Sequence, residues 1–282
     1  MNSDSFYTHE SVSDRVEAIH SLSGEIMYLI KGTEKALLVD TSVGVAGLRE
    51  LVDSLTELPL TVWITHGHVD HAMGAFFFRD VALFMNHADD AVLAVQSASE
   101  VRRGYLAGSV RESPERWAGA ELCPALPASS FQSLCDGDTL DLGGIHAEAY
   151  SLPGHTPGTM VVLIPEERIL ITGDAANSAV FLFDDFTSTV ETYRENLMSA
   201  ADRLRGRYDR CFQMHGWREA SGDLLQNLVR LCDQILAGDT DDVPFSFMGT
   251  TAFLAKAMDK FYRRLDGGEG NIIYNKEKVR NT

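Results

Sequence analysis

The sequence predicts an α/β fold, in which buried strands alternate with helices. Short apolar runs such as residues 60–65 and 160–164 have the length and composition of buried strands. Segments such as 190–204 and 224–235 carry apolar residues at helical spacing, which is typical of amphipathic helices. Side chains that can ligate metals follow several strands, and loops at strand ends are where α/β proteins usually place their chemistry.

The N-terminal half begins with strands that Ser-Gly and Gly-Thr turns separate, which predicts an antiparallel meander. The strands predicted in this half are residues 15–20, 25–31, 36–40, 60–65 and 81–85. A helix is expected over 45–58, where Pro59 ends it, and a short helix is expected at 74–78.

Residues 88–130 interrupt the strand pattern and predict a helical insertion, with helices at 88–96, 100–108 and 114–122. This insertion is expected to hang over the site as a substrate lid. Its arginines could bind a carboxylate or phosphate tail, or they could belong to a solvated helical surface; they are Arg102, Arg103, Arg111 and Arg116. Tyr105 and Trp117 are predicted to be core residues.

The C-terminal half predicts strands at 145–151, 160–164, 168–173, 210–214 and 271–274. Helices are predicted over 190–204, 224–235 and 251–265. The apolar stretch 180–186 could form a pocket wall or pack as ordinary core. We expect residues 1–240 to form the catalytic domain and residues 241–282 to form an extension packed on it.

Composition limits the function. The 282 residues are 45% hydrophobic, which suffices for the core of one large domain. A net charge of −17 argues against nucleic acid and anionic membranes as partners, and a small-molecule substrate is expected. No apolar stretch is long enough to span a membrane, and no secretory signal opens the sequence. Four cysteines without C-x-x-C spacing are typical of reduced thiols, so a cytoplasmic location is predicted; a homodimer remains possible.

The most specific motif is His66-Gly67-His68-Val69-Asp70-His71, directly after the predicted strand 60–65. Its spacing has a small risk of arising by chance, although a polar turn with capping histidines is the alternative. Imidazole and carboxylate ligands suit zinc and iron, and the absence of cysteine ligands argues against a structural zinc site.

Three further ligand-type residues follow predicted strands. His155 lies in Pro153-Gly154-His155-Thr156-Pro157-Gly158, Asp174 follows Thr172-Gly173, and His215 precedes Gly216. Proline and glycine at these positions form tight turns that let the backbone approach an ion closely. The repeated placement predicts that these residues gather at one edge of a sheet.

The ordered motifs H-x-H-x-D-H, P-G-H-T-P-G, T-G-D and a late His-Gly, over residues 14–217, resemble the metallo-β-lactamase-fold hydrolase superfamily. The resemblance implies an αββα sandwich, here with a helical insertion and a helical C-terminal extension. It implies that His66, His68 and His155 bind one metal, that Asp70, His71 and His215 bind a second, and that Asp174 bridges both. It further implies that Asp40 supports the ligands; Ser42 stands where the family usually has glycine.

The implied activity is dinuclear metal-dependent hydrolysis. A hydroxide that bridges two divalent ions, most simply zinc, with iron or manganese as alternatives, would attack a small ester, thioester or lactone. Asp70 is the candidate catalytic residue that steers this hydroxide. Glyoxalase-II-like thioesterases and lactonases share the full ligand set, but Asn177 stands where lactonases commonly have tyrosine. The alternatives are a non-catalytic metal-bound sensor or binding module, and a mono-iron sulfur dioxygenase.

Overall fold

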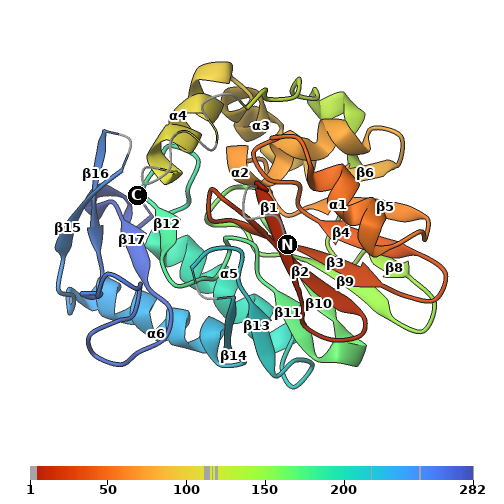
Figure 1. Ribbon diagram of the computed structural model, residues 1–282. Coiled ribbons are helices and arrows are strands. Elements are labelled where there is room, and N and C mark those ends of the chain that lie inside the picture. Colours follow the sequence, from red (N-terminus) through yellow and green to blue (C-terminus); the bar gives the residue numbers. More distant parts are fainter. Residues whose placement is uncertain are drawn as a thin grey trace. The chain divides into compact units, whose positions relative to one another are not determined.

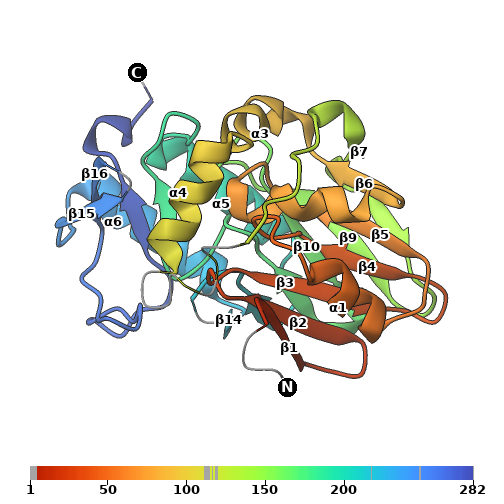
Figure 2. The ribbon, with the colours of Figure 1, turned by 45° about the horizontal axis from the view of Figure 1, so that its top comes forward.

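The computed structural model describes residues 5–110, 115, 117, 120–216, 218–247 and 249–281. The chain forms two compact units, Met1–Ala147 and Glu148–Thr282, which we call the N-terminal and C-terminal units. In Figures 1 and 2 the N-terminal unit runs from red to green and the C-terminal unit from green to blue. The predicted domain boundary between residues 240 and 241 stays a prediction. Within the described residues, no helix is both long and apolar enough to cross a membrane.

The N-terminal unit is built on a seven-stranded sheet in the order β1 to β7. Its strands are β1 (Tyr7–Ser11), β2 (Val16–Ser21), β3 (Ile26–Lys31), β4 (Ala36–Val39), β5 (Leu60–Ile64), β6 (Ala82–Met85) and β7 (Gln132–Ser133). Strands β1 to β4 pair antiparallel, which confirms the predicted meander, and β4 to β7 pair parallel. The carboxyl ends of the parallel strands β4 and β5 therefore meet at one edge, where the chain leaves for the metal-binding motif.

The helices of this unit close a core of buried apolar side chains. They are α1 (Leu48–Leu55), α2 (Val69–Ala72), η1 (Met73–Phe78), η2 (His87–Asp89), α3 (Asp90–Gln96), α4 (Ser99–Ser109) and η4 (Ala128–Ser130). Helix α1 buries Leu48 and Val52 in the same cluster as Leu38 of β4 and Val62 of β5. The first two helices of the predicted insertion are confirmed as α3 and α4, whereas the third, at 114–122, lies largely outside the described residues.

The larger sheet of the C-terminal unit has the order β14-β13-β11-β10-β9, and β8 (Thr139–Asp141) adds at the N-terminal end of β9. Its strands are β9 (His146–Ser151), β10 (Met160–Ile164), β11 (Ile169–Ile171), β13 (Arg210–Phe212) and β14 (Glu219–Ser221). The two predicted helices α5 (Val190–Arg203) and α6 (Leu224–Ala237) are confirmed, and each buries its apolar stripe in one core with this sheet.

A smaller sheet with the order β12-β17-β16-β15 completes the C-terminal unit. Its strands are β12 (Val180–Leu182), β17 (Ile272–Tyr274), β16 (Thr250–Leu254) and β15 (Val243–Phe247); β15 to β17 are blue in Figure 1. Strands β15 and β16 form an antiparallel hairpin, and β17 pairs with both β16 and β12.

The predicted helix over 251–265 is wrong. Residues 250–254 form strand β16, and the chain beyond them turns back through a bridge between Met258 and Arg264. The helical stripe in this segment is real as a pattern, but pairing with strands on both sides satisfies the backbone of β16 without a helix. The C-terminal extension past α6 is therefore mainly β-structure, with the short 3-10 turn η6 (Lys276–Lys278) near its end.

We expect Gly74→Ala to destabilise the protein strongly. A Cβ atom at Gly74 would lie 1.9 Å from the backbone oxygen of Thr41, and backbone cannot move aside cheaply. The free energy of unfolding should fall by about 3 kcal/mol or more in urea denaturation. The matched control is Gly108→Ala in α4, where nothing lies within 4 Å of the new atom; it should raise stability by about 0.5–1 kcal/mol. Equal stability of the two variants would contradict this packing.

Candidate metal centre

In the N-terminal unit, the histidines of residues 66–71 converge in a buried loop. Strand β5 ends at Ile64, and the loop runs into α2, which carries Asp70 and His71. The ring centroid of His66 lies 4.8 Å from that of His68 and 4.0 Å from that of His71. All three histidines and Asp70 are at most 9% exposed. The loop thus concentrates imidazole nitrogens in a protected space.

Asp40, directly after β4, stabilises this loop through hydrogen bonds. Its Oδ1 accepts a hydrogen bond from the Thr65 backbone N–H at 2.6 Å, and its Oδ2 accepts from the Thr65 hydroxyl at 2.7 Å. The same Oδ2 lies 2.6 Å from Nδ1 of His71. Since a carboxylate can only accept, Nδ1 carries the proton and Nε2 of His71 is left with its lone pair. This carboxylate–histidine arrangement is the one that orients metal-ligating histidines.

The backbone at Asp40 and Ser42 has a strained conformation, and local hydrogen bonds hold it there. Asp40 and Ser42 have φ values of +65° and +62°, in the left-handed region that favours glycine. This explains why glycine suits the position of Ser42. Here the Ser42 hydroxyl donates to the buried carboxylate of Glu25, which also accepts from Ser23 at 2.9 Å. The local bonds compensate for a conformation that costs on the order of 1 kcal/mol.

Tyr105 of α4 joins this polar group. Its hydroxyl donates to Glu25 Oε2 at 3.3 Å. Burial, together with the negative charges of Asp70 and Glu25, raises the pKa of Tyr105 well above its ordinary value. The hydroxyl therefore stays protonated and available as a donor on the side of the loop where Asp70 lies. The ring packs against the core of this unit, as predicted.

Asp89 is a supporting residue that the sequence did not single out. It is fully buried, and its Oδ2 accepts a hydrogen bond from the backbone N–H of Gly67 at 2.8 Å. A Cβ atom at Gly67 would lie 3.0 Å from the Leu93 nitrogen, so the loop needs glycine there. An acidic residue at the start of a helix is common as a cap, and its sequence pattern therefore carried no signal of this role.

Of the predicted lid arginines, Arg102 has a structural role. It is 4% exposed, and its guanidinium donates to the carbonyl of Cys123 at 2.6 Å and to that of Val43 at 3.0 Å. Arg103 is exposed on α4, and Arg111 and Arg116 lie outside the described residues. The lid itself stays a prediction.

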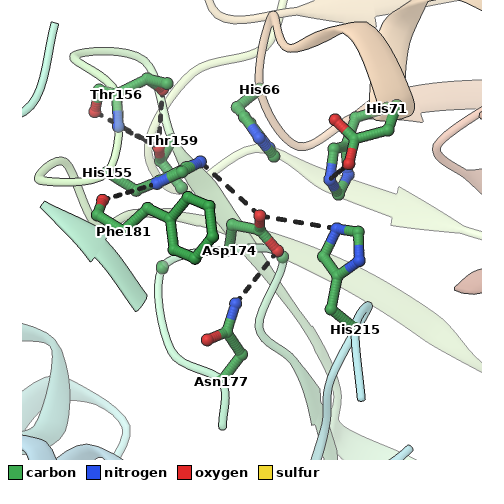
Figure 3. Close-up of polar contacts among 12 residues, drawn as sticks. His66, His71, His155, Thr156, Thr159, Asp174, Asn177, Phe181 and His215 are labelled. Carbon is green, nitrogen blue, oxygen red and sulfur yellow. Dashed lines mark hydrogen bonds and ion pairs between the residues drawn. The ribbon is translucent and has the colours of Figure 1, made fainter. Parts of the chain in front are cut away.

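In the C-terminal unit, three ligand-type residues meet around one carboxylate oxygen. His155 lies between β9 and β10, Asp174 follows β11, and His215 follows β13. Oδ2 of Asp174 lies 3.6 Å from Nε2 of His155 and also 3.6 Å from Nε2 of His215 (Figure 3). An oxygen placed evenly between two imidazole nitrogens has the position expected of a carboxylate that bridges two cations.

Hydrogen bonds hold these side chains in place. The Nδ1 atom of His155 donates to the carbonyl of Phe181 at 2.9 Å, which leaves the lone pair on Nε2 facing Asp174. The other oxygen of Asp174 accepts from the Asn177 amide at 3.2 Å (Figure 3). Imidazole nitrogens and carboxylate oxygens form a donor set that fits zinc, iron or manganese. In the N-terminal unit, atoms of Asp40, His66 and His71 likewise lie within 4.8 Å of one another.

The remaining histidines take no part in these arrangements, in line with their sequence setting. His9, His20, His87 and His146 each pair with a nearby acid, namely Glu17, Glu10, Asp90 and Asp141.

Comparison with known proteins identifies a family. The sequence model of the "Metallo-beta-lactamase superfamily" matches residues 26–245. Acyl-coenzyme A thioesterase MBLAC2 of Homo sapiens is 26% identical over 191 residues, which cover 62% of this chain and 68% of that protein. Hydroxyacylglutathione hydrolase GloC of Haemophilus influenzae is 25% identical over 165 residues, covering 55% and 71%.

Solved structures agree with the family match. A metallo-beta-lactamase from Pontibacter korlensis superposes with a TM-score of 0.59 at 18% identity, covering 79% of this chain and 97% of that one. At this identity the likeness concerns the fold alone. The predicted αββα fold class is thereby confirmed, with the exception of the helix at 251–265.

We expect Asp40→Asn to weaken metal binding about 10- to 100-fold without removing any proposed ligand. An asparagine has one acceptor oxygen for three donors, and its NH2 group would face N–H or O–H groups of Thr65 and His71. Zinc affinity is measured by competition with a chromogenic chelator. The control is Asp90→Asn, whose carboxylate is 48% exposed. Unchanged affinity in Asp40→Asn would refute the positioning role.

Proposed function

Because the chain belongs to the metallo-beta-lactamase superfamily, we propose that it is a metal-dependent hydrolase of a small ester, thioester or lactone, with thioesters as the preferred class. The observation that carries this proposal is the placement of one Asp174 oxygen 3.6 Å from Nε2 of both His155 and His215. A carboxylate and two imidazoles in such an arrangement can ligate cations. Two divalent cations held close together can activate water for hydrolysis.

The proposed ligands come from both parts of the sequence. We assign one metal to His66, His68 and His155, a second to Asp70, His71 and His215, and the bridging role to Asp174. The support is the donor chemistry of each set, the order of the motifs and the hydrogen bonds that fix His71 and His155. Zinc is the preferred ion, with iron or manganese as alternatives.

When bound, the metals would supply a hydroxide nucleophile at neutral pH and polarise the acyl carbonyl. The protein's own groups then control protons and orientation. The Asp70 carboxylate is the group proposed to steer the hydroxide and to pass the hydroxyl proton of the tetrahedral intermediate to the leaving thiolate. Tyr105 stays protonated because its pKa is raised by burial and by Asp70 and Glu25, so it does not compete with Asp70 for the proton.

Two observations favour thioesters over lactones. The relatives in Homo sapiens and Haemophilus influenzae are an acyl-coenzyme A thioesterase and a hydroxyacylglutathione hydrolase. Asn177 stands at the position where lactonases commonly have tyrosine, and its amide donates a hydrogen bond to Asp174.

The net charge of −17 supports a small-molecule substrate. The four free cysteines support the cytoplasmic location that we propose.

Removal of metal should abolish thioesterase activity. We expect protein dialysed against a chelator to lose at least about 100-fold in kcat/KM on acetyl- or butyryl-coenzyme A, because no other nucleophile is proposed. Zinc, manganese or iron should restore turnover, and elemental analysis should count two ions per chain. Full activity in metal-free protein would overturn the mechanism, and a single bound iron with sulfur dioxygenase activity would favour that alternative.

Asp174→Ala should lose bound metal together with turnover, since it removes the proposed bridge. Elemental analysis should show fewer than two ions per chain, and circular dichroism should show a retained fold. Asp185→Ala is the matched control, because Asp185 is an exposed acid in the same unit. A variant of Asp174 that retains two ions would refute the bridging assignment.

A further inference from the structure

Four phenylalanines form a distinct group on one face of the smaller sheet. Phe181 belongs to β12 and Phe183 directly follows it. Phe245 and Phe247 belong to β15. We call these four residues the phenylalanine cluster. Ring centroids are 4.9 Å apart for Phe181 and Phe183, 5.8 Å for Phe181 and Phe245, and 5.3 Å for Phe181 and Phe247. The cluster is separate from the main core of the C-terminal unit.

The cluster requires a curved sheet. Strands β12 and β15 stand at opposite edges of the order β12-β17-β16-β15, and in a flat sheet they would be about 14 Å apart. Their rings nevertheless touch. The two middle strands contribute Ala252 and Ile273 to this face, both at most 2% exposed. The small side chain of Ala252 lets the rings converge over the middle of the sheet.

The cluster is continuous with the proposed metal ligands of its own unit. Phe181 accepts the hydrogen bond from Nδ1 of His155 through its carbonyl, at 2.9 Å. Figure 3 shows the ring of Phe181 beside the imidazole of His155 and the carboxylate of Asp174. The same residue therefore fixes a proposed ligand with its backbone and contributes its ring to the cluster.

The cluster keeps accessible apolar surface. Phe183 is 8% exposed, whereas Phe181, Phe245 and Phe247 are only half-buried. The apolar side chains of this face are the four rings, Ala252, Ile273, Ala179 and Leu254. Nζ of Lys276 lies 4.2 Å from the ring centroid of Phe253, on the opposite face of β16.

We propose that the phenylalanine cluster binds the apolar acyl chain of the substrate. This inference rests on the proposed thioester hydrolysis and specifies its substrate class. The chain lies on the rings while its carbonyl carbon reaches the ligands beside Phe181. A hydroxylated short acyl group would leave the rings unused.

The test is a series of straight-chain acyl-coenzyme A thioesters from acetyl to dodecanoyl. For the wild type, kcat/KM should rise about two- to fourfold with each methylene that contacts the cluster. Phe247→Ala should flatten this rise, losing about tenfold or more on octanoyl and less than twofold on acetyl. Phe247→Leu should recover part of the preference, since it keeps apolar bulk. Phe261→Ala is the matched control, because Phe261 is 57% exposed outside the cluster.

A second measurement does not depend on hydrolysis. Dodecanoate binding to metal-free protein, followed by isothermal titration calorimetry, should weaken about tenfold in Phe247→Ala and stay unchanged in Phe261→Ala. A rate that is independent of chain length in the wild type, or an equal loss of Phe247→Ala on every thioester, would overturn the inference while leaving the hydrolase intact. Absence of turnover on all thioesters would instead contradict the proposed function, and dodecanoate binding would then still report on the cluster.

Discussion

The hydrogen bonds to the Asp40 carboxylate are the constraint on which the histidine loop depends. Asp40 stands at the end of β4, and it fixes both Thr65, at the end of the neighbouring β5, and the ring of His71. Thr65 in turn contacts Nδ1 of His66 at 3.0 Å. A buried carboxylate is costly unless it is fully hydrogen-bonded, so these groups must stay in register with one another. The parallel pairing of β4 and β5 thereby fixes the orientation of the imidazole rings of His66 and His71.

The C-terminal unit applies the same physical solution with different atoms. His155 is oriented by a backbone carbonyl, that of Phe181, and Asp174 is oriented by the amide of Asn177. In both units a ligand uses one polar atom to bond the scaffold and turns the other outward. Because the partners are strand ends and tight loops, little side-chain entropy remains to be lost when a cation binds.

The sequence correctly placed the proposed ligands at strand ends, because apolar runs followed by histidine or aspartate carry a local signal. It predicted α5, α6 and most strands because the spacing of their apolar residues is also a local signal. It missed Asp89, whose bond to Gly67 links residues that are distant in sequence. It also misassigned residues 251–265, where pairing with β15 and β17 outweighs a helical apolar pattern. The spacing of apolar residues along the sequence does not report which distant strands pair with one another.

That last difference bears directly on the proposed binding of the acyl chain. A helix over 251–265 would have aligned Phe253, Phe261 and Leu265 on one stripe, whereas strand geometry sends Phe253 to one face of β16 and Ala252 to the other. The register Phe245↔Ala252 then places a small residue opposite a ring, and it leaves room for Phe181 to reach across. A slip of one residue would reverse both faces. The strand register, rather than the metal-binding motifs, thus determines which apolar surface lies next to His155.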